Sequence, residues 1–189
     1  MYAVLDLETS GFSKTKNAIC EIGILIVDSD FKIIEEYESL IKPYPRRKEH
    51  QEEGKKMVSY KEDAMKINGI LMEDLEAAPD AEIIGKEVLE ILTKYGVTTI
   101  IGHNAKSFDM PWIHEFLDRF GGGFKFDDVI DTLLMARRIR NVKKGNKLPE
   151  LCELFGIENK DEHRALGDCN ATLKLLQVLI ELDLESTEN

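Results

Sequence analysis

The chain has 189 residues, of which 43% are hydrophobic and 32% charged, as is typical of one soluble globular domain with its own core. Asp6 and Glu8 interrupt the apolar start of the chain, and no run of about 18 apolar residues follows, which argues against a signal peptide or a membrane span and predicts a cytoplasmic protein. The formal net charge of −11 opposes nucleic-acid binding, unless bound divalent cations supply positive charge at the site.

The N-terminal part of the chain predicts an antiparallel meander. Residues 2–7, 18–28 and 31–42 have the apolar and β-branched character of strands, and residues 28–30 can form the hairpin turn between the last two. The segment 46–59 is polar and lacks apolar periodicity, so we expect a mobile loop within the same domain.

The rest of the chain predicts alternating helices and strands. Apolar periodicity indicates helices at 61–67, 81–95, 111–120, 132–140, 148–155 and 171–184, with short strands at 97–102 and 129–130. This order predicts an α/β fold with a mixed five-stranded sheet, antiparallel in its first three strands and then parallel, flanked by helices. We expect a single domain over residues 1–189, with its core in 2–182 and an acidic tail at 183–189.

Two carboxylates stand at the end of the first predicted strand. Asp6 and Glu8 are two residues apart, so their side chains project from the same face of a strand. Carboxylates this close repel one another unless a proton or a cation lies between them, and their oxygen atoms suit Mg²⁺ or Mn²⁺. Taken alone, the pair is better explained as a solvated strand edge.

Two further segments carry candidate site residues next to predicted elements. Asp109 follows the strand at 97–102, where it is either a site residue or a favourable charge in the first turn of a helix. Asp168 precedes the predicted helix at 171–184, and His163 lies five residues before Asp168. A histidine beside carboxylates suits a general base, although His163 taken alone also fits an exposed loop.

Together these residues resemble one family. The sequence is similar to the histidine-containing, DnaQ-like branch of the DEDD exonuclease superfamily (DEDDh), which includes the proofreading exonucleases of bacterial DNA polymerase III, ribonuclease T and oligoribonuclease. The resemblance rests on three motifs: Asp6-x-Glu8-Thr9-x-Gly11, His103-Asn104-x-x-x-Phe108-Asp109 and His163-x-Ala165-x-x-Asp168. The second motif has one residue more between Asn and Phe than the commonest form. The similarity covers residues 2–182 and implies a ribonuclease H-like fold.

The resemblance also implies a function, which is hydrolysis of phosphodiester bonds from the 3′ end of single-stranded DNA with release of nucleoside 5′-monophosphates. Asp6, Glu8, Asp109 and Asp168 would hold two divalent cations, Mg²⁺ or Mn²⁺, in a two-metal mechanism. His163 would act as the general base that takes the proton of the attacking water.

Side chains near the motifs are candidates for substrate contacts. An exposed aromatic or aliphatic side chain can stack on a terminal base without sequence preference. The residues that we expect to contact substrate are Thr9, Gly11, Phe12, Ile70, Asn104 and Phe108. His103 is expected to pack beside the site, and Asp131 to support it or to cap a helix. The basic segment 137–147 is a candidate for contacts with phosphates.

Other functions stay open at this point. An RNA exonuclease would use the same carboxylates, and the 2′-hydroxyl contact that distinguishes RNA is not legible in the sequence. A non-catalytic nucleic-acid-binding or polymerase-associated module would share the fold. The complete set of acids and histidine favours an enzyme, and the short stretch after the last predicted helix favours a separate enzyme over a polymerase-tethered subunit.

Overall fold

A five-stranded sheet lies at the centre of the computed structural model, which describes residues 1–142, 144–159 and 162–187. The strand order is β3-β2-β1-β4-β5. The strands are β1 (Tyr2–Thr9), β2 (Ile19–Val27), β3 (Ile33–Leu40), β4 (Thr99–Gly102) and β5 (Asp128–Asp131). β2 pairs antiparallel with β1 and β3, whereas β4 runs parallel to β1 and β5 parallel to β4. The predicted mixed sheet is confirmed.

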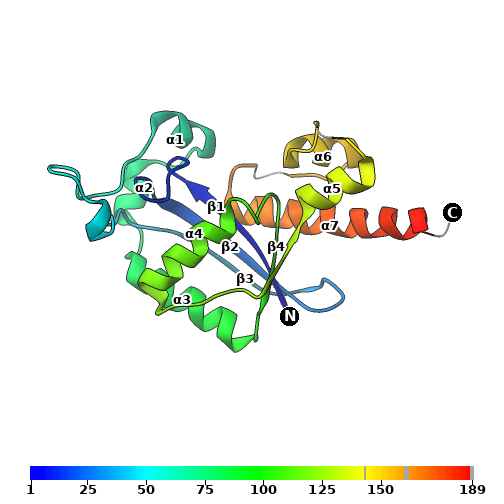
Figure 1. The fold of residues 1–189 in the computed structure, drawn as a ribbon, viewed down its shortest axis with the longest axis horizontal. Helices are drawn as coiled ribbons and strands as arrows, with labels where there is room; N and C mark the ends of the chain where they lie inside the picture. The colour runs from blue at the N-terminus through cyan, green and yellow to red at the C-terminus, as the bar shows by residue number, and fades with distance from the viewer. Residues whose placement is uncertain (143, 160–161, 188–189) are drawn as a thin grey trace.

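Helices flank the sheet on both sides (Figure 1). The α-helices are α1 (Glu62–Asn68), α2 (Met72–Ala77), α3 (Ala81–Lys94), α4 (Asp109–Phe116), α5 (Thr132–Arg140), α6 (Leu148–Phe155) and α7 (Ala165–Thr187). Two further helical segments are the 3₁₀ helix η1 (Lys48–His50) and the π-helix η2 (Leu117–Gly121), which directly continues α4.

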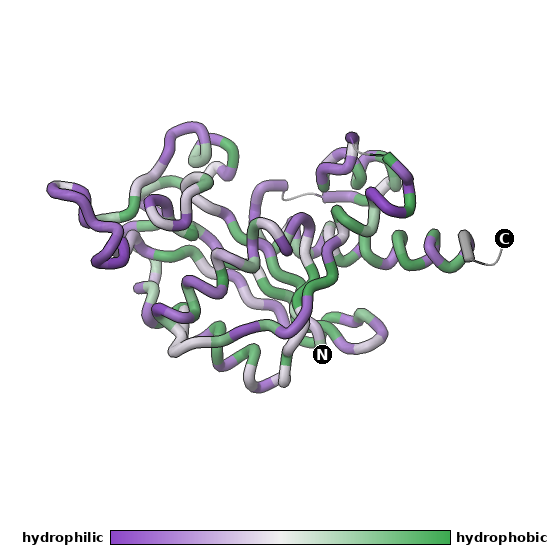
Figure 2. The backbone as a smooth tube through the Cα atoms, in the orientation of Figure 1, coloured by the Kyte–Doolittle hydropathy of each residue, from purple (hydrophilic) through white to green (hydrophobic). Residues whose placement is uncertain are grey.

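One face of the sheet carries the largest apolar cluster. Side chains alternate along a strand, so every second residue of β1 and β2 points to this face. The strand residues in the cluster are Ala3, Leu5, Leu7, Ile22, Ile24 and Ile26, and the helix residues of α3 and α4 that cover them are Ile84, Val88, Leu92, Trp112, Ile113 and Phe116. In Figure 2 the central strands are mostly hydrophobic, as this packing requires.

The opposite face of the sheet packs against α7. Val4 of β1 and Leu25 of β2 lie in a cluster with Cys169, Leu173 and Leu176 of α7. α5 and α6 pack on α7 through a further apolar cluster, and the last turns of α7 extend beyond the sheet in Figure 1. Because α7 crosses the sheet, its first turn lies over β2 while its end points away from the body of the domain.

The limits of several elements differ from those predicted. α7 begins at Ala165 instead of residue 171, so Asp168 lies in its first turn and does not precede the helix. Gly167 and Asp168 form helices poorly, and contacts with β2 override that preference. The helix continues to Thr187, so most of the expected acidic tail is helical, while residues 188–189 lie outside the described residues. α2 was not predicted, because it has six residues and buries only Leu75.

The segment 46–59, expected as a mobile loop, contains η1 and several local contacts. Arg46 is 6% exposed, and its backbone N–H donates to the Lys56 carbonyl oxygen over 2.8 Å. Arg47 forms ion pairs of 2.7 Å with Glu115 and with Asp118. These contacts attach the start of the segment to α4 and η2. Among the described helices, none is long and apolar enough to cross a membrane.

Candidate active site

The end of β1 supplies two carboxylates to the face of the sheet that α7 covers. Asp6 lies opposite Gly23 of β2, and Glu8 lies opposite Glu21, so all four positions share that face. Asp6 and Glu8 are both partly buried. The strand therefore places two acids side by side at the point where α7 begins, as the spacing of the first motif predicts.

Asp109 joins this pair from the first residue of α4. It is 3% exposed and follows the loop that leaves β4. Burial raises the pKa of Asp109 to about 7, although hydrogen bonds from the backbone amides of Asp109 and Leu7 oppose the rise. A carboxyl group that is buried in this way favours either a proton or a bound cation.

Asp168 and His163 come from α7 and the loop before it. Three of the described residues could hold a metal ion together, namely Glu8, His163 and Asp168. Each offers one ligand atom, and these three atoms lie within 4.8 Å of one another. Burial raises the pKa of Asp168, and a 2.7 Å hydrogen bond from the Asn159 amide to its Oδ1 opposes the rise. The sequence analysis missed Asn159, because no periodicity marks a residue in the loop between α6 and α7.

The electrostatics of these acids fit a divalent cation. Burial, followed by repulsion from Asp168, Glu21 and Asp109, raises the pKa of Glu8 to about 8. The pKa of Asp6 is also raised well above its usual value, first by burial and then by Asp109, Asp168 and Glu8. Repulsion of this kind is relieved when a cation binds between the oxygen atoms, and carboxylate oxygens are the ligands that Mg²⁺ and Mn²⁺ prefer.

Asp131 supports the site from the neighbouring strand, as predicted. Its Oδ1 caps α5 by accepting hydrogen bonds from the amides of Leu133 (3.0 Å) and Leu134 (3.3 Å). The same carboxylate accepts from the backbone N–H groups of Asn104 and Lys106, each over 3.1 Å. Asp131 therefore fixes the loop that leads from β4 to Asp109.

His103 packs beside the site. Its Nδ1 lies 2.9 Å from Thr132 Oγ1, and its Nε2 lies 2.9 Å from the Asn146 carbonyl oxygen. Burial lowers the pKa of His103, which keeps the ring neutral. Because both ring nitrogens have hydrogen-bond partners, His103 has no nitrogen to offer a metal in this arrangement.

A cavity of about 330 Å³ lies next to Glu8. Phe12 is 86% exposed at its rim and forms an edge contact with Phe108, with 6.5 Å between the ring centroids. The lining residues are Leu7, Glu8, Thr9, Gly11, Phe12, Lys61, Asp63, Ala64, Ile67 and Phe108. The cavity thus gathers Thr9, Gly11, Phe12 and Phe108 from the predicted substrate contacts, and it adds Ile67 and Lys61 of the α1 region, which the sequence analysis missed.

Ile70 and Asn104 do not join this cavity. Ile70 is 7% exposed and packs with Cys20 and Leu75, so the expected contact of its side chain with a terminal base is not supported. Asn104 is exposed but lines a different cavity, of about 580 Å³, together with Arg137 and other basic residues. Ile67, which lines the first cavity, is an aliphatic residue that is 62% exposed there.

Gly11 needs to be glycine. Its φ of +149° is rare for residues with a side chain, and a Cβ there would lie 2.7 Å from Asn17 Oδ1. Asn17 is 2% exposed and accepts a hydrogen bond from Ser13 N over 3.1 Å. The Thr9 hydroxyl donates to the Gly11 carbonyl over 3.0 Å. The turn after β1 is thereby held close to Glu8.

The fold and the site together define a ribonuclease H-like protein whose carboxylates fit divalent cations. The family described as Exonuclease (RNase_T) matches residues 3–176. The chain therefore belongs to this exonuclease family.

Curated relatives carry this domain within much longer chains. Over 189 residues the chain is 31% identical to the PolC-type DNA polymerase III of Staphylococcus aureus (strain bovine RF122 / ET3-1), covering 96% of this chain and 12% of the polymerase. It is 28% identical over 180 residues to the PolC-type enzyme of Halalkalibacterium halodurans, covering 95% of this chain and 11% of that one. The chain thus spans only a small part of these relatives.

Solved structures share the fold. The chain superimposes on E. coli Exonuclease I in complex with a dT13 oligonucleotide with a TM-score of 0.76 at 17% identity, covering 99% of this chain and 42% of that one. A zinc-bound form of the E. coli ExoI–ssDNA complex gives a TM-score of 0.74 at 19% identity, covering 95% and 40% of the two chains. At these identities the similarity establishes the fold.

Proposed function

We propose that the chain is a metal-dependent 3′→5′ exonuclease of the DEDDh type that releases nucleoside 5′-monophosphates from single-stranded DNA. The observation that carries this proposal is the convergence of Asp6, Glu8, Asp109, Asp168 and His163 beside an open cavity. The polymerase relatives and the oligonucleotide complexes of Exonuclease I support DNA as the substrate.

The four carboxylates are proposed to hold two cations, Mg²⁺ or Mn²⁺. Asp6, Glu8 and Asp168 would hold the first, and Asp6 with Asp109 would hold the second. This assignment fits the raised pKa of these groups, which burial causes first in each and which repulsion from neighbouring acids increases for Asp6 and Glu8. When bound, such a pair supplies Lewis-acid chemistry, lowering the pKa of water and neutralising charge on the leaving oxygen.

His163 is proposed to be the general base. Its side chain is 44% exposed, so water reaches an imidazole nitrogen, and it lies beside Glu8 and Asp168. The ring takes the proton of the attacking water as the phosphodiester bond is cleaved. Glu162 Oε1 lies 3.4 Å from His163 Nε2 and faces the positive charge that the ring then carries.

The cavity beside Glu8 is proposed to hold the terminal nucleotide. Phe12 and Ile67 offer exposed apolar surface to a base, and stacking on such surface does not depend on the base. Thr9 and Gly11 line the same cavity as Glu8, and we propose that they face the sugar. This arrangement accounts for hydrolysis one nucleotide at a time from an end.

The experiment that tests the proposal is digestion of 5′-labelled single strands. DNA and RNA oligomers of one sequence are incubated with the protein and Mn²⁺, with and without EDTA. We expect a ladder of products shortened from the 3′ end on DNA, which EDTA and the substitution Asp6→Asn both abolish. A faster ladder on RNA would favour an exoribonuclease, and an intact strand in the presence of Mn²⁺ would favour a non-catalytic module.

A further inference from the structure

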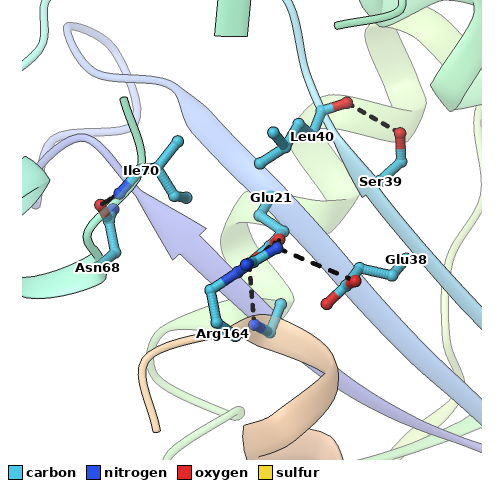
Figure 3. A network of polar contacts seen from close by, with 8 residues as sticks. Glu21, Glu38, Ser39, Leu40, Asn68, Ile70 and Arg164 are labelled. Atoms are coloured by element: carbon cyan, nitrogen blue, oxygen red, sulfur yellow. Dashed lines mark hydrogen bonds and ion pairs between the residues drawn. The ribbon is translucent and has the colours of Figure 1, made fainter. Parts of the chain in front are cut away.

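An ion pair between half-exposed Arg164 and buried Glu21 lies next to His163 in the chain. The Arg164 guanidinium donates from Nε to both oxygens of Glu21, over 3.0 and 3.1 Å, and from Nη2 to Oε1 over 2.5 Å. The backbone N–H of Ala165 donates to Glu21 Oε2 over 3.0 Å. Figure 3 shows Arg164, just before α7, reaching to Glu21 near the start of β2. The residue next to His163 is thus attached to a central strand.

The geometry of the Arg164–Glu21 pair fixes the position of Arg164 against β2. The Glu21 side chain is fully buried, and a buried carboxylate is costly unless charge and hydrogen bonds compensate it. A planar guanidinium that engages both oxygens fixes direction as well as distance, which a lysine ammonium does not. Glu38 Oε2 lies 4.0 Å from Arg164 Nη2 on the outer side, so acids from two strands hold the arginine.

The start of α7 also rests directly on β2. A Cβ on Gly23 would lie 2.5 Å from the Ala165 carbonyl carbon and 2.6 Å from Leu166 N, so only a glycine allows this approach. Gly23 is the partner of Asp6 in the sheet register, and Glu21 is the partner of Glu8. The two contacts that hold the first turn of α7 therefore lie next to the two acids of β1.

His163 itself has a backbone conformation that needs support. Its φ of +66° lies in the left-handed region, which residues with a side chain rarely adopt. Such a conformation persists where surrounding contacts determine it. The Arg164–Glu21 pair begins at the next residue and supplies such contacts.

We propose that Glu21 and Arg164 are positioning residues, which hold the imidazole of His163 beside Glu8 and Asp168. This inference rests on the proposed role of His163 as a general base. Neither residue touches the reacting atoms in this proposal, since Arg164 is engaged by acids and Glu21 is covered by α7. The two residues are 143 positions apart in the sequence, so only the fold brings them together.

The kinetic test is the conservative substitution Arg164→Lys, which keeps the charge that buried Glu21 requires. We expect kcat to fall by about 10²-fold, the effect typical of a catalytic group displaced by about 1 Å, with KM and Mn²⁺ affinity unchanged. In a His163→Ala background the same substitution should cost less than about twofold, because the group that it positions is gone. Arg47→Lys is the matched control, since Arg47 also pairs with two acids but on α4 and η2.

The structural test does not depend on activity. The imidazole Cε1–H signal of His163 in the metal-free protein, assigned by its loss in His163→Ala, should shift or broaden in Arg164→Lys and stay unchanged in Arg47→Lys. An unchanged signal, or an equal loss of kcat with and without His163, would overturn the positioning role. A wild-type protein that leaves DNA intact, with a signal that still responds to Arg164→Lys, would overturn the proposed function and not the positioning.

Discussion

β1 has two faces that differ in chemistry, although their residues alternate along one strand. Ala3, Leu5 and Leu7 point into the largest apolar cluster, and none is more than 5% exposed. Asp6 and Glu8 point to the other face, where the pKa of each is raised by burial and by neighbouring acids. The first face contributes only apolar packing, whereas the second holds, beyond Val4, negative charge that opposes folding until a proton or a cation neutralises it.

This comparison teaches that activity and stability depend on different residues of one strand. Changing a residue on the apolar face creates a cavity, while removing an acid relieves repulsion. Substitution of Leu5 and substitution of Asp6 should therefore have opposite effects on stability.

The largest effect is expected from substitution in β1 itself. Asp6→Asn should lower exonuclease activity by about 10³-fold or more, because it removes a cation ligand whose contribution is several kcal/mol. The same change should leave the melting temperature in EDTA equal or higher. Leu5→Ala should instead lower the free energy of unfolding by about 2–5 kcal/mol and keep the activity of the folded fraction. Chemical denaturation and the DNA ladder measure the two quantities; a strong loss of stability in Asp6→Asn would contradict the comparison.

The next largest effect on activity is expected from substitution of His163, which lies beside Glu8. His163→Ala should lower kcat by about 10²–10⁴-fold, the usual contribution of a general base, and should retain Mn²⁺ binding. Isothermal calorimetry of Mn²⁺ binding, with Asp168→Ala as the control that loses affinity, separates a base from a ligand. Loss of Mn²⁺ binding in His163→Ala would make the histidine a cation ligand.

A smaller effect is expected in the pH dependence of the metal-free protein. Because the pKa of Glu8 is raised to about 8, the folded state binds more protons than the unfolded state above pH 7, so stability falls as pH rises. His103 and His114, whose pKa values are lowered, oppose this fall only slightly near pH 7, because the unfolded histidines lose their remaining protons as pH rises above it. Melting in EDTA from pH 7 to 8.5 should show a falling temperature, and Mn²⁺ should reduce or reverse the fall. A rising temperature in EDTA would refute the repulsion on this face.

The smallest effect is expected on DNA binding, from basic residues that lie on neither face of β1. Arg137 and Lys147 line the cavity that includes Asn104, and we expect them to contact phosphates of a bound strand. Arg137→Gln or Lys147→Gln should each reduce the slope of log affinity against log salt by about 0.7 on single-stranded DNA. Lys94→Gln is the control, because Lys94 is paired with Glu35 over 2.7 Å. Fluorescence anisotropy across a salt series measures the slope, and equal slopes in all variants would exclude this path for the strand.

The sequence predicts the sheet and the acids well, because both depend on local patterns. The alternation of β1 and β2 follows directly from apolar and β-branched residues, and Asp6 and Glu8 share a face by spacing alone. Asp131 is also predictable, since an acid before a helix is an ordinary cap.

The contacts that the sequence does not reveal are those made by tertiary packing. Glu21 lies in an apolar strand, and nothing near it indicates a partner that is 143 residues away. The early start of α7 depends on the space at Gly23 as much as on helix propensity. Ile70 was expected to stack on a terminal base, but packing buries it, while Ile67, three residues earlier, is exposed at the cavity.

The distribution of charge in this acidic chain affects how a polyanion approaches it. Its formal net charge is −11, yet basic residues gather in the segment 137–147, while the carboxylates gather at the end of β1. The basic segment attracts the phosphates of a strand locally, which steers the strand during its diffusional approach to the domain. Capture of a strand then becomes a directional event whose rate falls as ionic strength rises.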